Sequence, residues 1–177
     1  MSSVSPRVLV AGVGNLFLRD DGFGPEVARL LALPGGAPLP AGVHVVDYGI
    51  RGMHLAYDLL EGWDALVLVD AMPDAGGSPG EVRLVRVRTE DLGHGDLDAH
   101  GMDPAAVLAG LTALGGTLPP TYVVGCHPAT VAEGIGLSPA VAAAVSGAAG
   151  LLRRLLDDLT ADDHAPDAGA PARTAGR

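Results

Sequence analysis

The stretch Val8-Leu-Val-Ala-Gly-Val-Gly-Asn-Leu-Phe-Leu-Arg-Asp-Asp-Gly-Phe-Gly24 decides the fold, because it joins the first strand to the first helix. Continuous apolar residues over 7–13 predict a strand that is buried on both faces, as in a parallel sheet. The glycines that follow favour a tight turn, and apolar residues at helical spacing then predict a helix over residues 21–33. A glycine turn between a strand and a helix is typical of a phosphate site, where the helix N-terminus faces the ligand.

Two adjacent carboxylates, Asp20 and Asp21, indicate a different ligand at the start of this helix. They would repel a phosphate and attract a cation. Either aspartate also fits the ordinary role of an N-cap. The turn at Gly12 and Gly14 keeps open a second hypothesis, a nucleotide-binding, Rossmann-like oxidoreductase, although no third glycine follows at the dinucleotide spacing.

Apolar runs along the rest of the chain predict four further strands and three further helices. The strands cover residues 43–47, 65–70, 81–88 and 121–126, and the helices cover residues 53–60, 103–114 and 138–158. The third of these strands carries several arginines, which imply one face in contact with water and place the strand at or near an edge of the sheet. The order of elements predicts one α/β domain over residues 1–159, a three-layer αβα sandwich of phosphorylase/hydrolase-like type around a mostly parallel five-stranded sheet. The composition of residues 160–177 predicts a disordered tail.

The composition also bounds the partners and the compartment. The 177-residue chain has a formal net charge of −10, which argues against nucleic acid as a partner because phosphate binding needs clustered positive charge. No apolar run approaches the length of a membrane span, and the N-terminus lacks the layout of a signal peptide. Cys126 is the single cysteine, which fits a reducing compartment. We expect a cytoplasmic protein with no membrane partner.

Acidic and histidine side chains follow several of the predicted strands. The carboxyl ends of parallel strands meet at one edge of the sheet, and this edge is where such folds bind ligands. It collects the Asn15–Asp21 segment, Asp47, Asp70 and His127. Asp21, Asp70 and a histidine would form a mixed site that suits Zn²⁺, Ni²⁺ or Fe²⁺ and leaves positions open for water or substrate.

Spacing alone does not identify the histidine ligand. His100 lies in a polar loop before a predicted helix, from which it could swing in, whereas His127 lies at the correct edge but precedes a proline. Chemistry alone leaves both open. Asp47 likewise has a second interpretation, which is that it orders the turn of residues 49–52.

Nucleophilic catalysis is not indicated by the sequence. Cys126 and His127 are neighbours in the chain, but adjacent strand residues point to opposite faces and cannot readily pair. The chain also has no GxSxG motif for a serine nucleophile.

Several short motifs occur in a fixed order between residues 7 and 158. They are Val10-Ala-Gly-Val-Gly-Asn15 with Asp20-Asp21-Gly22-x-Gly24, Asp47-x-Gly49-x-x-Gly52, Leu68-Val-Asp70-Ala71, His100 before a helix, Val124-Gly125-x-x-Pro128, and Gly136-Leu137-Ser138 with Val141. In this order they resemble the hydrogenase maturation proteases, which trim the C-terminus of the nickel–iron hydrogenase large subunit. The resemblance implies that the metal-binding residues are Asp21, Asp70 and His100, so that His100 is selected by the family pattern and not by spacing. Residues expected to line the same site are Gly14, Asn15, Asp47 and His127.

The resemblance also implies the reaction and the partner. The chain would be an endopeptidase that removes a C-terminal peptide from the nickel-loaded precursor of a hydrogenase large subunit. Nickel would arrive with that precursor, and no organic cofactor is expected. The metal could polarise the scissile carbonyl or activate water. A non-catalytic chaperone that holds the precursor is the alternative on the same fold.

Overall fold

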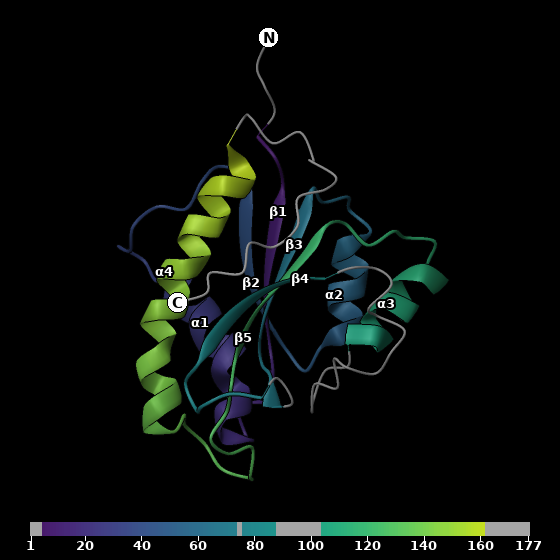
Figure 1. The fold of residues 1–177 in the computed structure, drawn as a ribbon. Coiled ribbons are helices and arrows are strands. Elements are labelled where there is room, and N and C mark those ends of the chain that lie inside the picture. The colour runs from purple at the N-terminus through teal and green to yellow at the C-terminus, as the bar shows by residue number, and fades with distance from the viewer. Residues whose placement is uncertain (1–4, 74–75, 88–103, 162–177) are drawn as a thin grey trace, which may run out of the picture.

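The computed structural model describes residues 5–73, 76–87 and 104–161, in which strands and helices alternate (Figure 1). The strands are β1 (Val8–Val13), β2 (Val43–Gly49), β3 (Ala65–Ala71), β4 (Val82–Val87) and β5 (Thr121–Cys126). The helices are the 3-10 turn η1 (Arg19–Gly22), α1 (Phe23–Leu31), α2 (Gly52–Leu59), α3 (Pro104–Ala113) and α4 (Pro139–Thr160). This order confirms the predicted alternation and adds η1 to it.

The strands form one sheet with the order β2-β1-β3-β5-β4. All neighbours are parallel except β4, which runs antiparallel to β5. Every residue of β1 and β3 is buried, because these strands lie inside the sheet and are covered on both faces. The prediction of a mostly parallel five-stranded sheet is confirmed.

Strand β4 forms one edge of the sheet, as its arginines predict. Arg83 and Arg86 are both exposed. The Arg86 guanidinium lies 6.0 Å from the centre of the Tyr122 ring on β5, its cross-strand partner. Charged side chains on an edge strand discourage pairing with a further strand from another molecule.

Helices cover both faces of the sheet and complete the three layers (Figure 1). Helices α1 and α4 pack on one face, where Phe23, Leu152 and Leu156 lie in the core. Helices α2 and α3 pack on the other face around Leu55 and Leu111. The predicted αβα sandwich is therefore confirmed.

Contrary to the prediction that no apolar run approaches the length of a membrane span, helix α4 is long and apolar enough to cross a membrane by length and composition, and it is the one such helix in the described part of the chain. It has 22 residues and a mean hydropathy of 1.2 over its most apolar window. One face is buried in the core through Val141, Leu152 and Leu156, whereas Asp157 and Asp158 are exposed on the other. This one-sided burial is the pattern of an amphipathic core helix.

The start of α1 differs from the prediction. Asp20 and Asp21 lie in η1, and the N-cap position of α1 is Gly22. Within the described residues, neither aspartate accepts a capping hydrogen bond from the backbone of α1. The alternative role of a helix cap is therefore not observed for either residue, because both carboxylates accept hydrogen bonds elsewhere.

Candidate metal centre

Gly14 makes the turn after β1 possible. Its φ is +137°, and its N–H donates to the carbonyl oxygen of Gly49 at 3.0 Å, which joins the turn to the end of β2. A Cβ at this position would collide with the backbone oxygen of Asp21. The glycine thus serves close packing of η1 against the end of β1. This use of the turn weakens the nucleotide-binding hypothesis, which needs the glycines to face a pyrophosphate.

A second glycine brings the start of α1 against the sheet. A Cβ at Gly24 would collide with the backbone oxygens of Val13 on β1 and Val69 on β3. Helix α1 therefore begins at the carboxyl ends of both strands. This placement sets η1, which carries Asp21, beside the residue that follows Val69, which is Asp70.

The Asp21 carboxylate is held at the inner side of the first turn. Asp21 is only 3% exposed, and its Oδ2 accepts a hydrogen bond from the Asn15 N–H at 2.7 Å. The Asn15 side chain in turn accepts a hydrogen bond from the Phe17 N–H at 2.9 Å. Asn15 therefore orients the Asp21 carboxylate through its backbone and orders its own turn through its side chain.

Asp70 ends the wholly apolar run of β3 and is 6% exposed. Its Oδ1 accepts a hydrogen bond from the Ala71 N–H at 2.8 Å. Burial raises the pKa of Asp70 well above its ordinary value, the negative charge of Asp21 raises it further, and the Ala71 hydrogen bond opposes both effects only in part. The two carboxylates are therefore electrostatic neighbours in a buried place, where a cation would relieve both the burial and the repulsion.

Asp20 is fully buried and has a different role from its neighbour. Its carboxylate accepts hydrogen bonds from the N–H groups of Ala129 at 2.8 Å, Thr130 at 3.1 Å and Ser138 at 2.6 Å, and from the Ser138 hydroxyl at 2.8 Å. Burial works against ionisation, but the hydrogen bonds from Ser138, Thr130 and Ala129 outweigh it, so the pKa of Asp20 lies below its ordinary value. Asp20 fastens the loop before α4 to η1.

The same contact changes the start of α4. Ser138 occupies the N-cap position of α4, as predicted, but its hydroxyl makes no cap hydrogen bond within the described residues and donates to Asp20 instead. Sequence reasoning missed this pairing. The only signal in the sequence was Asp20, the first of the two adjacent aspartates. A helix cap was the local explanation for it, whereas its partners lie 109 to 118 residues away.

Asp47 lies at the end of β2 and is exposed. Its Oδ1 accepts a hydrogen bond from the Gly49 N–H at 2.9 Å, and its backbone oxygen accepts one from the Arg51 guanidinium. These contacts match the second interpretation of Asp47, which is that it orders the turn after β2. The carbonyl oxygen of Gly49 also accepts the hydrogen bond from the Gly14 N–H, so the turn after β2 supports the turn after β1.

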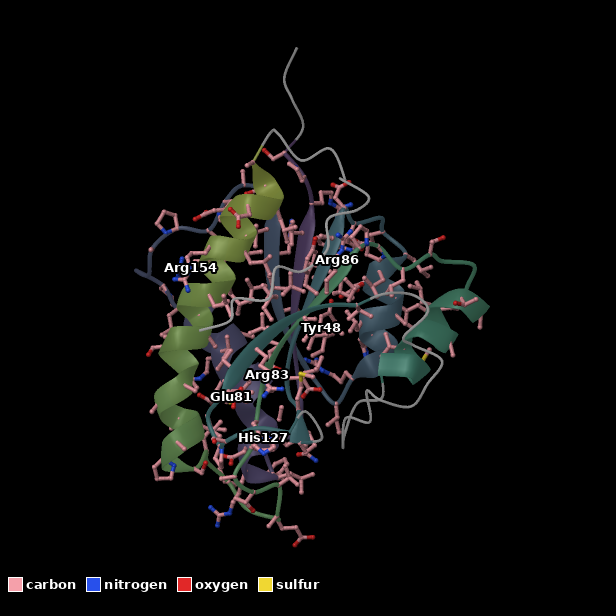
Figure 2. All side chains as sticks on the ribbon, viewed as in Figure 1. Tyr48, Glu81, Arg83, Arg86, His127 and Arg154 are labelled. Carbon is pink, nitrogen blue, oxygen red and sulfur yellow. The ribbon has the colours of Figure 1, made fainter. Side chains whose placement is uncertain are left out.

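His127 follows β5 and lies near Glu81 (Figure 2). Its backbone pairs with residues of the β4 side: its N–H donates to Glu81 and its carbonyl accepts from Gly80. Its buried Nδ1 has no hydrogen-bond partner within the described residues. His127, Glu81 and Arg83 line a small hollow together with Met72 and glycines 76, 77 and 125.

Among the residues that the structure describes, no three His, Cys, Asp or Glu side chains gather closely enough to hold a metal ion. His127 therefore does not complete a site with Asp21 and Asp70. His100, the predicted third ligand, lies outside the described residues. So does His94, which precedes it in the same predicted loop and is the other histidine there. Asp21 and Asp70, which we call the acidic pair, lie near each other, and their binding of a metal, like the third ligand, stays a prediction.

Cys126 offers no nucleophile. Its side chain is buried, and burial followed by the charge of Asp20 raises the pKa of the thiol to about 11. Only a small fraction of such a thiol is the reactive thiolate near neutral pH. A cysteine mechanism is accordingly disfavoured by burial and charge as well as by strand geometry.

Comparison with known proteins identifies the group to which this architecture belongs. The family description "Hydrogenase maturation protease" matches residues 31–154, which is well over half of the chain. The chain belongs to the hydrogenase maturation protease family. The expected resemblance is thus confirmed, and the coarse class of the protein is that of a peptidase family.

Individual relatives agree with this membership. The chain is 32% identical over 143 residues to the hydrogenase 2 maturation protease of Escherichia coli K12, covering 80% of this chain and 85% of that one. It is 34% identical over 141 residues to the hydrogenase expression/formation protein HupD of Rhodobacter capsulatus, but there it spans only 64% of the relative's length. The solved structure of the hydrogenase maturating endopeptidase HybD from E. coli has a TM-score of 0.73 at 29% identity, covering 86% of this chain and 93% of that chain.

Proposed function

We propose that this protein is an endopeptidase that removes a C-terminal peptide from the nickel-loaded precursor of a hydrogenase large subunit. Family membership supports the class of reaction and the class of partner. The observation that supports a site is the buried pair of Asp21 and Asp70. Burial and the negative charge of Asp21 both raise the pKa of Asp70, and a bound cation would offset both effects. The pair lies at the carboxyl edge of the parallel strands, where this class of fold binds its ligands.

Nickel in this proposal is part of the substrate. Two carboxylates are a sparse ligand set, and adding the predicted His100 would still leave positions open on the metal. A sparse set suits transient recognition of an ion that the precursor itself holds. Cleavage then becomes conditional on nickel, since a precursor without the ion lacks the charge that compensates the acidic pair.

The chemistry at the scissile bond follows from what a bound cation supplies. The ion would act as a Lewis acid toward the peptide carbonyl or toward a water molecule. The protein's own contribution is to hold Asp21 through the Asn15 N–H and Asp70 through the Ala71 N–H, so that both carboxylates are oriented before the substrate arrives. Cys126 plays no part in this scheme.

The proposal also includes a cytoplasmic location, in which the single thiol stays reduced. The acidic chain, with its net charge of −10, is unsuited to nucleic acid. The protein partner in the proposal is the large-subunit precursor alone, with no organic cofactor.

The direct test is incubation of the protein with nickel-loaded and nickel-free precursor, followed by mass spectrometry for a small C-terminal peptide. We expect the peptide only from the nickel-loaded sample. Asp70→Asn and His100→Ala should abolish its release while circular dichroism shows a retained fold. Glu133→Gln removes an exposed carboxylate from a loop at the same edge and should leave the release nearly unchanged.

Two results would contradict the proposal. Normal maturation of the precursor by both site variants would remove the acidic pair and His100 from the reaction. Binding of the precursor by the wild type without any loss of mass would instead favour the non-catalytic chaperone.

A further inference from the structure

Two loops are fastened together at the edge that carries the acidic pair. Leu18 and Gly134 form an isolated parallel bridge. The Gly134 N–H donates to the carbonyl oxygen of Phe17 at 2.8 Å, and the Arg19 N–H donates to the carbonyl oxygen of Gly134 at 3.0 Å. The first loop leads into η1, and the second leads into α4. Together with the four hydrogen bonds of Asp20, these contacts make the two loops one rigid unit.

This unit exposes large apolar side chains. Phe17 is 69% exposed and Ile135 is 76% exposed, which are the two largest values among the big apolar side chains in the described ranges. The residues flank the Leu18–Gly134 bridge, one on each loop, so we call Phe17 and Ile135 the loop tips. Exposed apolar side chains are ordinary when scattered over a surface, but beside a candidate ligand site they favour a binding surface.

The loop tips are continuous with the acidic pair. The Asn15 N–H holds the Asp21 carboxylate, while the Asn15 side chain accepts a hydrogen bond from the Phe17 N–H. One turn therefore sets both the direction of a candidate metal ligand and the position of an apolar tip. Phe17 and the Asp21 carboxylate are therefore both held by one residue, Asn15.

We propose that the loop tips are a docking contact for the folded body of the protein substrate, separate from the contact made by its metal-bearing tail. This inference rests on the proposed function. The partner would present an apolar pocket beside a positively charged, metal-bearing segment. Rigid loops lose little conformational freedom on binding, so apolar tips on them contribute efficiently to affinity.

Charge and size favour this occupant over others. The net charge of −10 repels an anionic membrane surface. Two side chains are also a small patch, whereas a stable homodimer generally buries on the order of 800 Å² on each partner. A substrate protein differs from both, because the tail at the acidic pair adds a second point of attachment.

The test compares Phe17→Ser/Ile135→Ser with Leu33→Ser/Leu114→Ser. The control residues, Leu33 and Leu114, are 46% and 40% exposed and lie just after α1 and α3. They are therefore near the amino ends of the parallel strands, away from the carboxyl ends that carry Asp21 and Asp70. Both double variants are first checked for an unchanged melting temperature. Cleavage kinetics and equilibrium binding are then measured with the nickel-loaded precursor.

We expect the loop-tip variant to raise KM and Kd at least tenfold with kcat within about twofold, and the control variant to match the wild type. Unchanged Kd in the loop-tip variant overturns the inference while leaving the proposed function intact, since the wild type still cleaves. A fall in kcat with unchanged Kd also overturns it. If the wild type binds the precursor but never cleaves it, the proposed function fails, and loss of that binding in the loop-tip variant alone still supports the docking contact.

Discussion

The Asp20 carboxylate accepts two hydrogen bonds from Ser138, one from the backbone N–H at 2.6 Å and one from the hydroxyl at 2.8 Å. The adjacent Asp21 carboxylate faces Asn15 and the charge of Asp70 instead. Two neighbouring aspartates in η1 therefore serve separate purposes. One fastens the loops of the binding edge, and the other belongs to the candidate metal centre.

Asp20→Asn should destabilise the protein by about 2 kcal/mol at neutral pH, because the amide cannot accept all the hydrogen bonds that the carboxylate accepts. This corresponds to a melting temperature lower by roughly 4–8 °C. The pKa of Asp20 is lowered by folding, so its contribution is present above the ordinary pKa near 4 and is lost as pH falls through the lower folded-state value. Thermal melts should therefore show the gap between variant and wild type closing below about pH 4.

Glu133→Gln is the matched control for this prediction, since it removes an exposed carboxylate from the loop that Asp20 fastens. It should leave the melting temperature within about 1 °C of the wild type. An equal loss of stability in both variants would mean that total charge, and not the hydrogen bonds of Asp20, is responsible.

Asp70→Asn should raise the melting temperature of the isolated protein at neutral pH. The folded state raises the pKa of Asp70, so ionisation of this group costs stability increasingly as pH rises from about 4 through the raised value. The variant carries no such charge, and its advantage should disappear at pH 3. Melts between pH 3 and pH 8 measure this; a variant that is less stable at every pH would contradict it.

Added metal should make the wild type melt at a higher temperature than Asp70→Asn, the reverse of the order expected without metal. A cation that binds only the folded state stabilises it in proportion to the logarithm of its concentration above Kd. Ni²⁺ or Cd²⁺ should therefore raise the melting temperature of the wild type but not of Asp70→Asn, whereas NAD and FAD should affect neither. Stabilisation of the wild type by a dinucleotide would revive the oxidoreductase hypothesis.

Gly14→Ala should cost about 3 kcal/mol and weaken metal binding, because the new Cβ meets the Asp21 backbone at a left-handed φ. Gly35→Ala provides the control. Gly35 also has a positive φ, of +82°, but a Cβ there would meet nothing within 4 Å. We expect it to cost about 1 kcal/mol and to leave metal affinity unchanged in calorimetric titrations. Equal metal affinity in both variants would contradict the role of Gly14 in placing Asp21.

His127→Ala should leave cleavage within about twofold of the wild type and stability within about 1 kcal/mol, since its buried Nδ1 has no described partner to lose. His100→Ala should abolish cleavage. His94→Ala, in the same stretch of chain as His100, is the control for that loss. Abolished cleavage in His127→Ala with full activity in His100→Ala would reverse the assignment.

The sheet could be predicted because its inner strands are unambiguous. The continuous apolar runs of β1 and β3 leave no wetted face, and the arginines of β4 mark an edge. The antiparallel direction of β4 was not predicted, because a short loop and an alternating pattern do not fix strand direction.

The acidic pair could be placed at one edge by the rule for parallel strands, and its charge coupling bears out that proximity. The role of Asp20 could not be predicted, since local rules favour a helix cap over partners that are distant in the chain. The third metal ligand depends on how a polar glycine-containing loop folds, which periodicity does not determine.

The Asp20–Ser138 contact also has a consequence for biosynthesis. The two residues are 118 positions apart, so at translation rates of roughly 5–20 residues per second a nascent chain carries Asp20 without Ser138 for roughly 6–24 s. During that interval α4 is also missing from the core face that it covers. The loops at the edge that carries Asp21 and Asp70 are therefore fastened together only near the end of synthesis, and an incomplete chain on the ribosome lacks the finished surface.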